Sequence, residues 1–201
     1  MKKFLAAALS VAALSSAHAV VVDFDTLPGG GSIASGSIIT NEYASVGVVF
    51  SMSDLGAPQT GPYAIQQFAG SSNPYGNALW NCNVGCGPRS DTITMTFSAP
   101  VSAVSWLVDS EGSMPITFNA YDSSNVLLES VSIMSDFPSY ASASFSVGGI
   151  ARIDAVNPTQ GWGWAMDNLT FTTSAVPEPE SYALALAGLM VVGALARRRQ
   201  A

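Results

Sequence analysis

Basic side chains are scarce in this sequence and unevenly placed. Only 7 of its 201 residues are lysine or arginine, against 14 acidic residues. Five of the seven lie at the two ends of the chain, so positions 20 to 176 keep two, Arg89 and Arg152, beside twelve acids. The formal net charge of that segment is therefore −10, and it holds no basic cluster. These absences exclude nucleic acid as a partner.

Lysine and histidine are missing from the same segment, because the one histidine, His18, lies before it. A Ser–His–Asp or Cys–His system needs a histidine and a Ser–Lys pair needs a lysine, so these nucleophilic mechanisms are excluded. Carboxylate chemistry remains, since two acids can hydrolyse a glycosidic bond. Asp109 and Glu111 are the nearest candidates, although the sequence favours solvated turn residues for both. The sequence predicts a protein that is not an enzyme, and a carboxylate-dependent secreted hydrolase is the less favoured alternative.

The first nineteen residues have the three parts of a secretory signal peptide. Lys2 and Lys3 form the positive end, positions 4 to 14 form the apolar region, and Ala17-His18-Ala19 forms a cleavage site of small residues. We expect cleavage to leave Val20 as the first residue of the exported protein. Residues 1–19 are thus predicted to be a signal peptide, and residues 20–175 a single folded domain.

Residues 176–201 also consist of three parts. An apolar run from Tyr182 to Ala196 reaches only ~22 Å as a helix, at about 1.5 Å per residue. The hydrocarbon core of a membrane is roughly 30 Å thick, so this transmembrane helix would be a weak anchor. The arginines behind it should stay on the cytoplasmic side of the inner membrane. The motif before the run is Val176-Pro177-Glu178-Pro179-Glu180-Ser181, and the arginines after it are Arg197, Arg198 and Arg199.

This order of parts resembles the PEP-CTERM sorting signal of Gram-negative bacteria. The resemblance implies export through the inner membrane, a transient anchor there, and processing by an exosortase, a membrane cysteine transpeptidase. It also implies delivery to the cell surface or extracellular matrix of bacteria that make extracellular polysaccharide. We therefore expect a protein associated with exopolysaccharide, and a carbohydrate-binding module is the alternative.

The two cysteines, Cys82 and Cys86, are separated by three residues. A disulfide is the default for an exported protein. A loop this short gains only ~2 kcal/mol, so the bond would staple a local loop. A metal or redox role is the alternative, although zinc would need two further soft ligands.

Strand patterns fill the segment between the two signals. Asp91–Phe97 and Ala141–Val147 alternate strictly between apolar and small polar residues, as antiparallel strands with one buried face do. Ala99-Pro100 is read as a turn between two strands, and Gly148-Gly149 as a two-residue hairpin. Nine or ten such short strands predict an all-β, antiparallel β-sandwich of jelly-roll type.

A second resemblance concerns this domain. Positions 22–27, Tyr43–Phe50 and Met166–Phe171 resemble the jelly-roll domains often attached to PEP-CTERM signals. Those domains are similar in outline to carbohydrate-binding modules whose first and last strands pair beside a structural calcium. The resemblance therefore implies that the two ends of this domain are neighbours.

Asp23, Asp25 and Asp167 are the candidate metal ligands. The first two flank Phe24 on the first predicted strand, and Asp167 shares an inward face with Leu169, where a lone carboxylate is costly. Calcium takes carboxylate and carbonyl oxygens, so a structural Ca²⁺ would satisfy these side chains. The alternative is that Asp167 caps amides of a loop.

Trp80, Trp162 and Trp164 lie among Gly, Asn and Pro residues. Flat aromatic rings on loops can stack against sugars, so these three are the candidate sugar contacts. Burial in the core is the alternative for each of them.

Overall fold

The computed structural model describes residues 18–54, 61–65, 67–68, 71–72, 76–82, 91–110, 115–135, 139–157 and 163–173, together with 186, 188–190, 193 and 197. The chain divides into two units, His18–Ser174 and a second made of Met1–Ala17 with Ala175–Ala201. The predicted signal peptide and C-terminal signal lie almost entirely outside the described residues, so both stay predictions. Within the described part of the chain, no helix is both long enough and apolar enough to cross a membrane.

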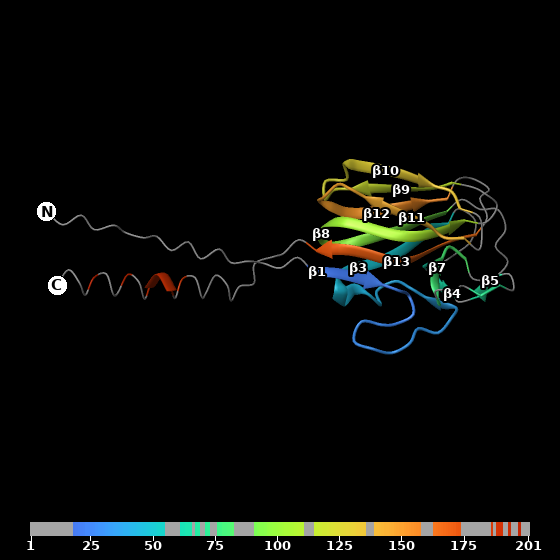
Figure 1. The fold of residues 1–201 in the computed structure, drawn as a ribbon, viewed down its shortest axis with the longest axis horizontal. Coiled ribbons are helices and arrows are strands. Elements are labelled where there is room, and N and C mark those ends of the chain that lie inside the picture. The colour runs from blue at the N-terminus through green and yellow to red at the C-terminus, as the bar shows by residue number, and fades with distance from the viewer. Residues whose placement is uncertain are drawn as a thin grey trace. The chain divides into compact units, whose positions relative to one another are not determined.

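Among the described residues between 18 and 173, the regular structure is antiparallel strand apart from one short helix, which confirms the predicted all-β class (Figure 1). One 3-10 helix, η1, covers Ala44–Val46. The strands are β1 (His18–Val22), β2 (Ser37–Ile38), β3 (Val48–Asp54), β4 (Tyr63–Ile65), β5 (Gln67–Phe68), β6 (Ser71–Ser72), β7 (Ala78–Trp80), β8 (Asp91–Ser110), β9 (Ile116–Tyr121), β10 (Leu127–Ile133), β11 (Ala141–Phe145), β12 (Ile150–Val156) and β13 (Trp164–Thr173).

The long strand β8 belongs to both layers of the sandwich. Its first part pairs with β3 and β12, and β9 and β10 continue that layer beyond β12. Its last part pairs with β11 and β13. The far side of β13 pairs with β1 and β7, and β4 and β2 continue from β7. The predicted β-sandwich is thus confirmed, and its first and last strands, β1 and β13, are neighbours as expected.

Aromatic rings from the two layers meet in the core. The ring centroid of Phe118 on β9 lies 4.6 Å from that of Trp106 on β8 and 5.9 Å from that of Trp164 on β13. Phe97 on β8 lies 5.0 Å from Phe171 on β13. All five side chains are at most 5% exposed. Inward-facing rings of this kind are what hold two facing sheets together.

Two predicted turns are wrong. Ala99-Pro100 lies inside β8, where the strand passes from one layer to the other. The pairing of β12 with β8 is irregular there, which suits a proline because it has no N–H to give to the ladder. Gly148-Gly149 does not close a hairpin, because β11 and β12 pair with different parts of β8. The connection instead crosses between the layers, and the N–H of Gly149 donates to Val101 O at 3.0 Å.

Candidate functional site

One residue of the predicted sorting motif lies in the described part of the chain. Arg197 is an exposed helical residue, and the others lie outside the described part of the chain. They are Val176, Pro177, Glu178, Pro179, Ser181, Arg198 and Arg199. The sorting function therefore stays a prediction.

Cys82 follows β7 and is 1% exposed. It is not a free thiol. Cys86 lies outside the described residues, so the pairing of Cys82 with Cys86 stays a prediction.

The described tryptophans are core residues and not surface contacts. Trp164 is fully buried, with its Nε1–H donating to Asp91 Oδ1 at 3.2 Å. Trp80 is 2% exposed and packs with Ala165 in a smaller cluster on the other side of β13 from the main core. Neither ring can stack against a sugar, and Trp162 lies outside the described residues. The alternative of core burial therefore holds for both.

Two of the candidate carboxylates lie on one face of the β8–β13 ladder. Asp109 pairs with Ala165, and Asp167 follows two residues later on β13, so both side chains leave the same face. Each is 1% exposed, so Asp109 is not the solvated turn residue that the sequence favoured. Glu111, its predicted partner in hydrolysis, lies outside the described residues.

The face assigned to Asp167 was also wrong. The ladder of β13 with β8 is irregular between Asp167 and Thr170, and Asn168 has φ 49°. This β-bulge reverses the alternation, so Met166 and Leu169 both enter the core while Asp167 leaves it. Asp167 Oδ1 accepts the N–H of Asn168 at 2.7 Å, which is a local cap of the bulge.

Asp23 and Asp25 lie in a turn and not on a strand. β1 ends at Val22, and Phe24 takes φ 55°. Asp23 Oδ1 accepts the N–H groups of Asp25 at 3.1 Å and Thr26 at 3.0 Å. When an aspartate carboxylate accepts hydrogen bonds from backbone N–H groups two or three residues later, those groups no longer pair with a neighbouring strand. The strand therefore ends there.

These residues form a corner with two partners from distant parts of the chain. Asp25 Oδ1 accepts the N–H of Asn77 at 2.7 Å, and the Asn77 amide donates to Phe24 O and Ile33 O at 3.2 and 2.9 Å. The hydroxyl of Tyr43 donates to Thr26 O at 3.0 Å. We call the set Asp23, Asp25, Tyr43 and Asn77 the aspartate corner.

The aspartate corner does not fit a calcium site well. The oxygens of Asp23, Asp25, Phe24 and Thr26 named above already accept N–H or O–H groups. Across the described residues, no group of three or more acidic, histidine or cysteine side chains could hold a metal ion. Burial raises the pKa of Tyr43 well above its ordinary value, and the charges of Asp23, Asp25 and Asp167 raise it further. The three aspartates are thus within electrostatic range of one hydroxyl without forming a ligand set.

A different surface gathers polar groups at the outside of the layer β10-β9-β12-β8-β3. The register of these five strands aligns their outward residues in three rows, each crossing all five strands. None of these residues is buried. We call them the ladder face. From β10 to β3 the rows are Leu127, Tyr121, Arg152, Thr96 and Val49; Ser130, Asn119, Asp154, Thr94 and Ser51; and Ser132, Thr117, Val156, Thr92 and Ser53.

Side chains in neighbouring strands of the ladder face bond to one another. Ser130 Oγ donates to Asn119 Oδ1 at 2.8 Å, and Thr94 Oγ1 donates to Asp154 Oδ1 at 2.9 Å. Thr117 Oγ1 and Ser132 Oγ lie 2.8 Å apart. Such cross-strand pairs orient the side chains, so the face presents polar groups in fixed positions.

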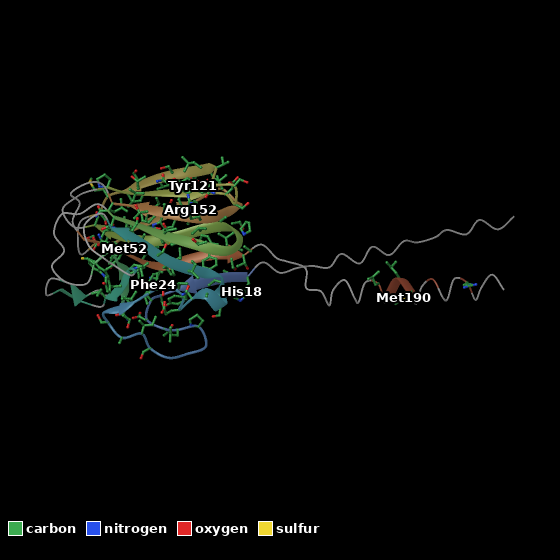
Figure 2. The ribbon with its side chains drawn as sticks, turned by 180° about the vertical axis from the view of Figure 1, so that it is seen from behind. His18, Phe24, Met52, Tyr121, Arg152 and Met190 are labelled. Carbon is green, nitrogen blue, oxygen red and sulfur yellow. The ribbon has the colours of Figure 1, made fainter. Side chains whose placement is uncertain are left out.

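Arg152 is the one cation of the ladder face, and three contacts hold it. Its Nε lies 3.3 Å from Asp154 Oδ1, and its Nη1 donates to Asn125 Oδ1 at 2.9 Å. The guanidinium carbon lies 4.3 Å from the centroid of the Tyr121 ring. Figure 2 shows Tyr121 and Arg152 on neighbouring strands, where their backbones are paired. Arg152 remains 31% exposed, so it can reach a ligand from this fixed position.

Sequence reasoning missed the ladder face. Each strand has polar residues at nearly every second position, and that pattern indicates only that one face of the strand is exposed to solvent. Which strands lie side by side depends on β8 joining β12 and β3, whose residues are far apart in sequence. The signal that could have pointed to it was Arg152, because the predicted domain has only two basic residues.

Comparisons with known proteins give no family for this chain. No protein-family model and no curated protein matches the chain. Among solved structures, TmCBM61 in complex with β-1,4-galactotriose matches with 12% identity and a TM-score of 0.45, over 62% of this chain and 88% of that one. A mutant of CBM29-2, a family 29 carbohydrate-binding module complexed with mannohexaose, matches with 14% identity and a TM-score of 0.41, over 79% and 94%. An arabinose-bound α-L-arabinofuranosidase, MgGH51, matches with 10% identity and a TM-score of 0.43, over 70% of this chain and 25% of that one.

Proposed function

We propose that the β-sandwich is a polysaccharide-binding module of an exported protein, and that the ladder face contacts the sugar chain. The observation that carries the proposal is the row of hydrogen-bonding side chains that crosses five strands at an accessible surface. Hydroxyl, amide and carboxylate groups can together satisfy sugar hydroxyls, which both donate and accept hydrogen bonds.

The geometry of the face suits an extended chain. Neighbouring strands lie about 4.8 Å apart, so polar groups recur across the sheet at a spacing comparable to the width of a sugar ring. The middle row offers a hydroxyl, an amide, a carboxylate and two more hydroxyls in succession. Tyr121 lies beside this row and is partly exposed, with Arg152 over its ring, so this pair adds an aromatic and a cationic group to the same surface.

The remaining parts of the proposal rest on the sequence. Export, sorting by an exosortase and a final place at the cell surface or in the matrix rest on the resemblance of residues 176–201 to PEP-CTERM signals. The jelly-roll type of the sandwich rests on its pattern of short strands. A non-catalytic role is supported by the lack of lysine and histidine between positions 20 and 176. The burial of Asp109 adds to this, because a catalytic acid must reach the substrate.

The test is affinity electrophoresis of the full chain, purified in mild detergent, through gels that contain mannan, galactan or the producing cells' own exopolysaccharide. The double variant Asn119→Ala/Thr117→Ala should lose about tenfold in affinity, because it removes two neighbouring hydrogen-bonding groups of β9 from the ladder face. Its matched control is Ser142→Ala/Ser144→Ala, which removes two exposed hydroxyls of β11 in the other layer. We expect the control to bind as the wild type does.

Two results would contradict the proposal. Unchanged migration of the wild type in all three gels would show that the module binds no such polysaccharide. Equal losses in the two double variants would show that the ladder face is not where the sugar lies.

A further inference from the structure

We infer that the ladder face selects uncharged polysaccharides, and that Asp154 is the residue that excludes acidic ones. This inference rests on the proposed function. It adds the chemical class of the ligand and names one specificity-determining side chain.

The charges on the ladder face cancel. Arg152 and Asp154 are its only charged members, and their side chains form an ion pair with Nε and Oδ1 3.3 Å apart. Around the pair, the segment from 20 to 176 has a formal net charge of −10. The field above the face is therefore neutral to negative, and it gives no attraction to a carboxylate or sulfate group of an acidic polysaccharide.

Two further acidic residues, on β10 and in the turn before it, shift this balance further to the negative side. Asp122, in the β9–β10 turn, accepts the N–H groups of Ser124 and Val126 at 2.8 Å each. Glu129 on β10 accepts the N–H groups of Ser146 and Val147 at 3.0 and 3.3 Å. Both carboxylates thus hold turns of the backbone, and their negative charge adds to the repulsion of an anion.

Asp154 governs what Arg152 can recognise. A free arginine would offer its fork of N–H groups to a carboxylate on the ligand. Here the carboxylate of Asp154 already faces that arginine, and it also accepts the hydroxyl of Thr94 at 2.9 Å. An anion that approached Arg152 would meet Asp154 at contact distance. A sugar hydroxyl meets no such repulsion, since it can accept from Arg152 and donate to Asp154.

Replacing Asp154 by asparagine should therefore widen the specificity. Asparagine keeps the size of the side chain and an acceptor for Thr94, but it leaves the charge of Arg152 uncompensated. Near a protein surface, a negative charge about 4 Å from a bound anion repels it appreciably. Removing that charge from Asp154 should therefore raise the affinity for an acidic polysaccharide about fivefold or more. The gain should vanish in high salt, because exposed charges are then screened.

The experiment compares the full chain, in mild detergent, on neutral mannan and galactan and on acidic polygalacturonate, in low and in high salt. Asp154→Asn is matched by Glu42→Gln, which makes the same change in net charge at an exposed residue before η1. The wild type and Glu42→Gln should be retained by a neutral polysaccharide and not by polygalacturonate. Asp154→Asn should gain affinity for polygalacturonate in low salt only.

The outcomes separate the inference from the proposed function. Wild-type binding to polygalacturonate as strong as to the neutral polysaccharides would overturn the inference and leave the proposed function in place. An equal gain in Asp154→Asn and Glu42→Gln, or no gain in either, would show that Asp154 has no special role. A wild type that none of these three polysaccharides retains, and that also migrates unchanged in gels with the cells' own exopolysaccharide, would contradict the proposed function itself.

Discussion

The aspartate corner and the ladder face are both rich in carboxylate, amide and hydroxyl groups, but they use them in opposite ways. At the corner, the backbone N–H and C=O groups of the turns have no partner strand. The side chains of Asp23, Asp25 and Asn77 bond to those groups instead. On the ladder face, the backbone is already satisfied by the strands, so the side chains named above bond to other side chains and stay open to solvent. Residue type alone therefore does not identify a binding site. What matters is whether those polar atoms already form hydrogen bonds to backbone groups that the fold leaves without a strand partner.

The largest effect on stability should come from adding a side chain at Gly76, where it would collide with the carboxylate of Asp25. A Cβ on Gly76 would lie 2.2 Å from Asp25 Oδ2, and Gly76 has φ +98°. Gly76→Ala should therefore lower the free energy of unfolding by about 3 kcal/mol, measured by urea denaturation. Gly149→Ala is the control, because Gly149 has φ +83° but no atom within 4 Å of the new Cβ. It should lose only about 1 kcal/mol. Similar losses in the two variants would mean that backbone strain alone matters and that the packing of Asp25 does not.

A smaller effect should appear at alkaline pH. The pKa of Tyr43 is raised in the folded state, so its contribution to stability is complete below the unfolded value of about 10 and is lost as pH rises through the folded value. Tyr43→Phe should cost about 1 kcal/mol at pH 7, through the lost bond to Thr26 O. Above pH 10 the difference in unfolding free energy between wild type and variant should shrink. A constant difference from pH 7 to 11 would show that Tyr43 titrates as it does in the unfolded chain.

The smallest expected effect is that of calcium. Since Asp23 Oδ1, Asp25 Oδ1 and Thr26 O already accept N–H or O–H groups, the melting temperature in millimolar calcium should equal that in excess chelator. The measurement is differential scanning calorimetry of the full chain, with Asp167→Ala measured alongside. A drop on chelation that Asp167→Ala abolishes would restore the calcium site that the sequence suggested, and would place the corner among ligand sites after all.

Some features followed from the sequence alone because their causes are local. Alternating apolar and polar residues predicted strands such as Asp91–Phe97, whose apolar side chains are buried. The dense strand signals and the lack of helical patterns predicted the antiparallel sandwich. The order of parts in residues 176–201 and the scarcity of basic residues also needed no structure, since both are statements about the chain itself.

Other features were decided only by tertiary structure, because they depend on which distant residues become neighbours. The bulge at Asn168 reversed the face of Asp167, and the left-handed conformation of Phe24 moved Asp23 and Asp25 from a strand into a turn. β8 passes through Pro100 into the second layer, and its first part joins β12 to β3. That joining sets Arg152 and Asp154 beside the threonines of β8, and no local pattern in the sequence encodes which strands will meet.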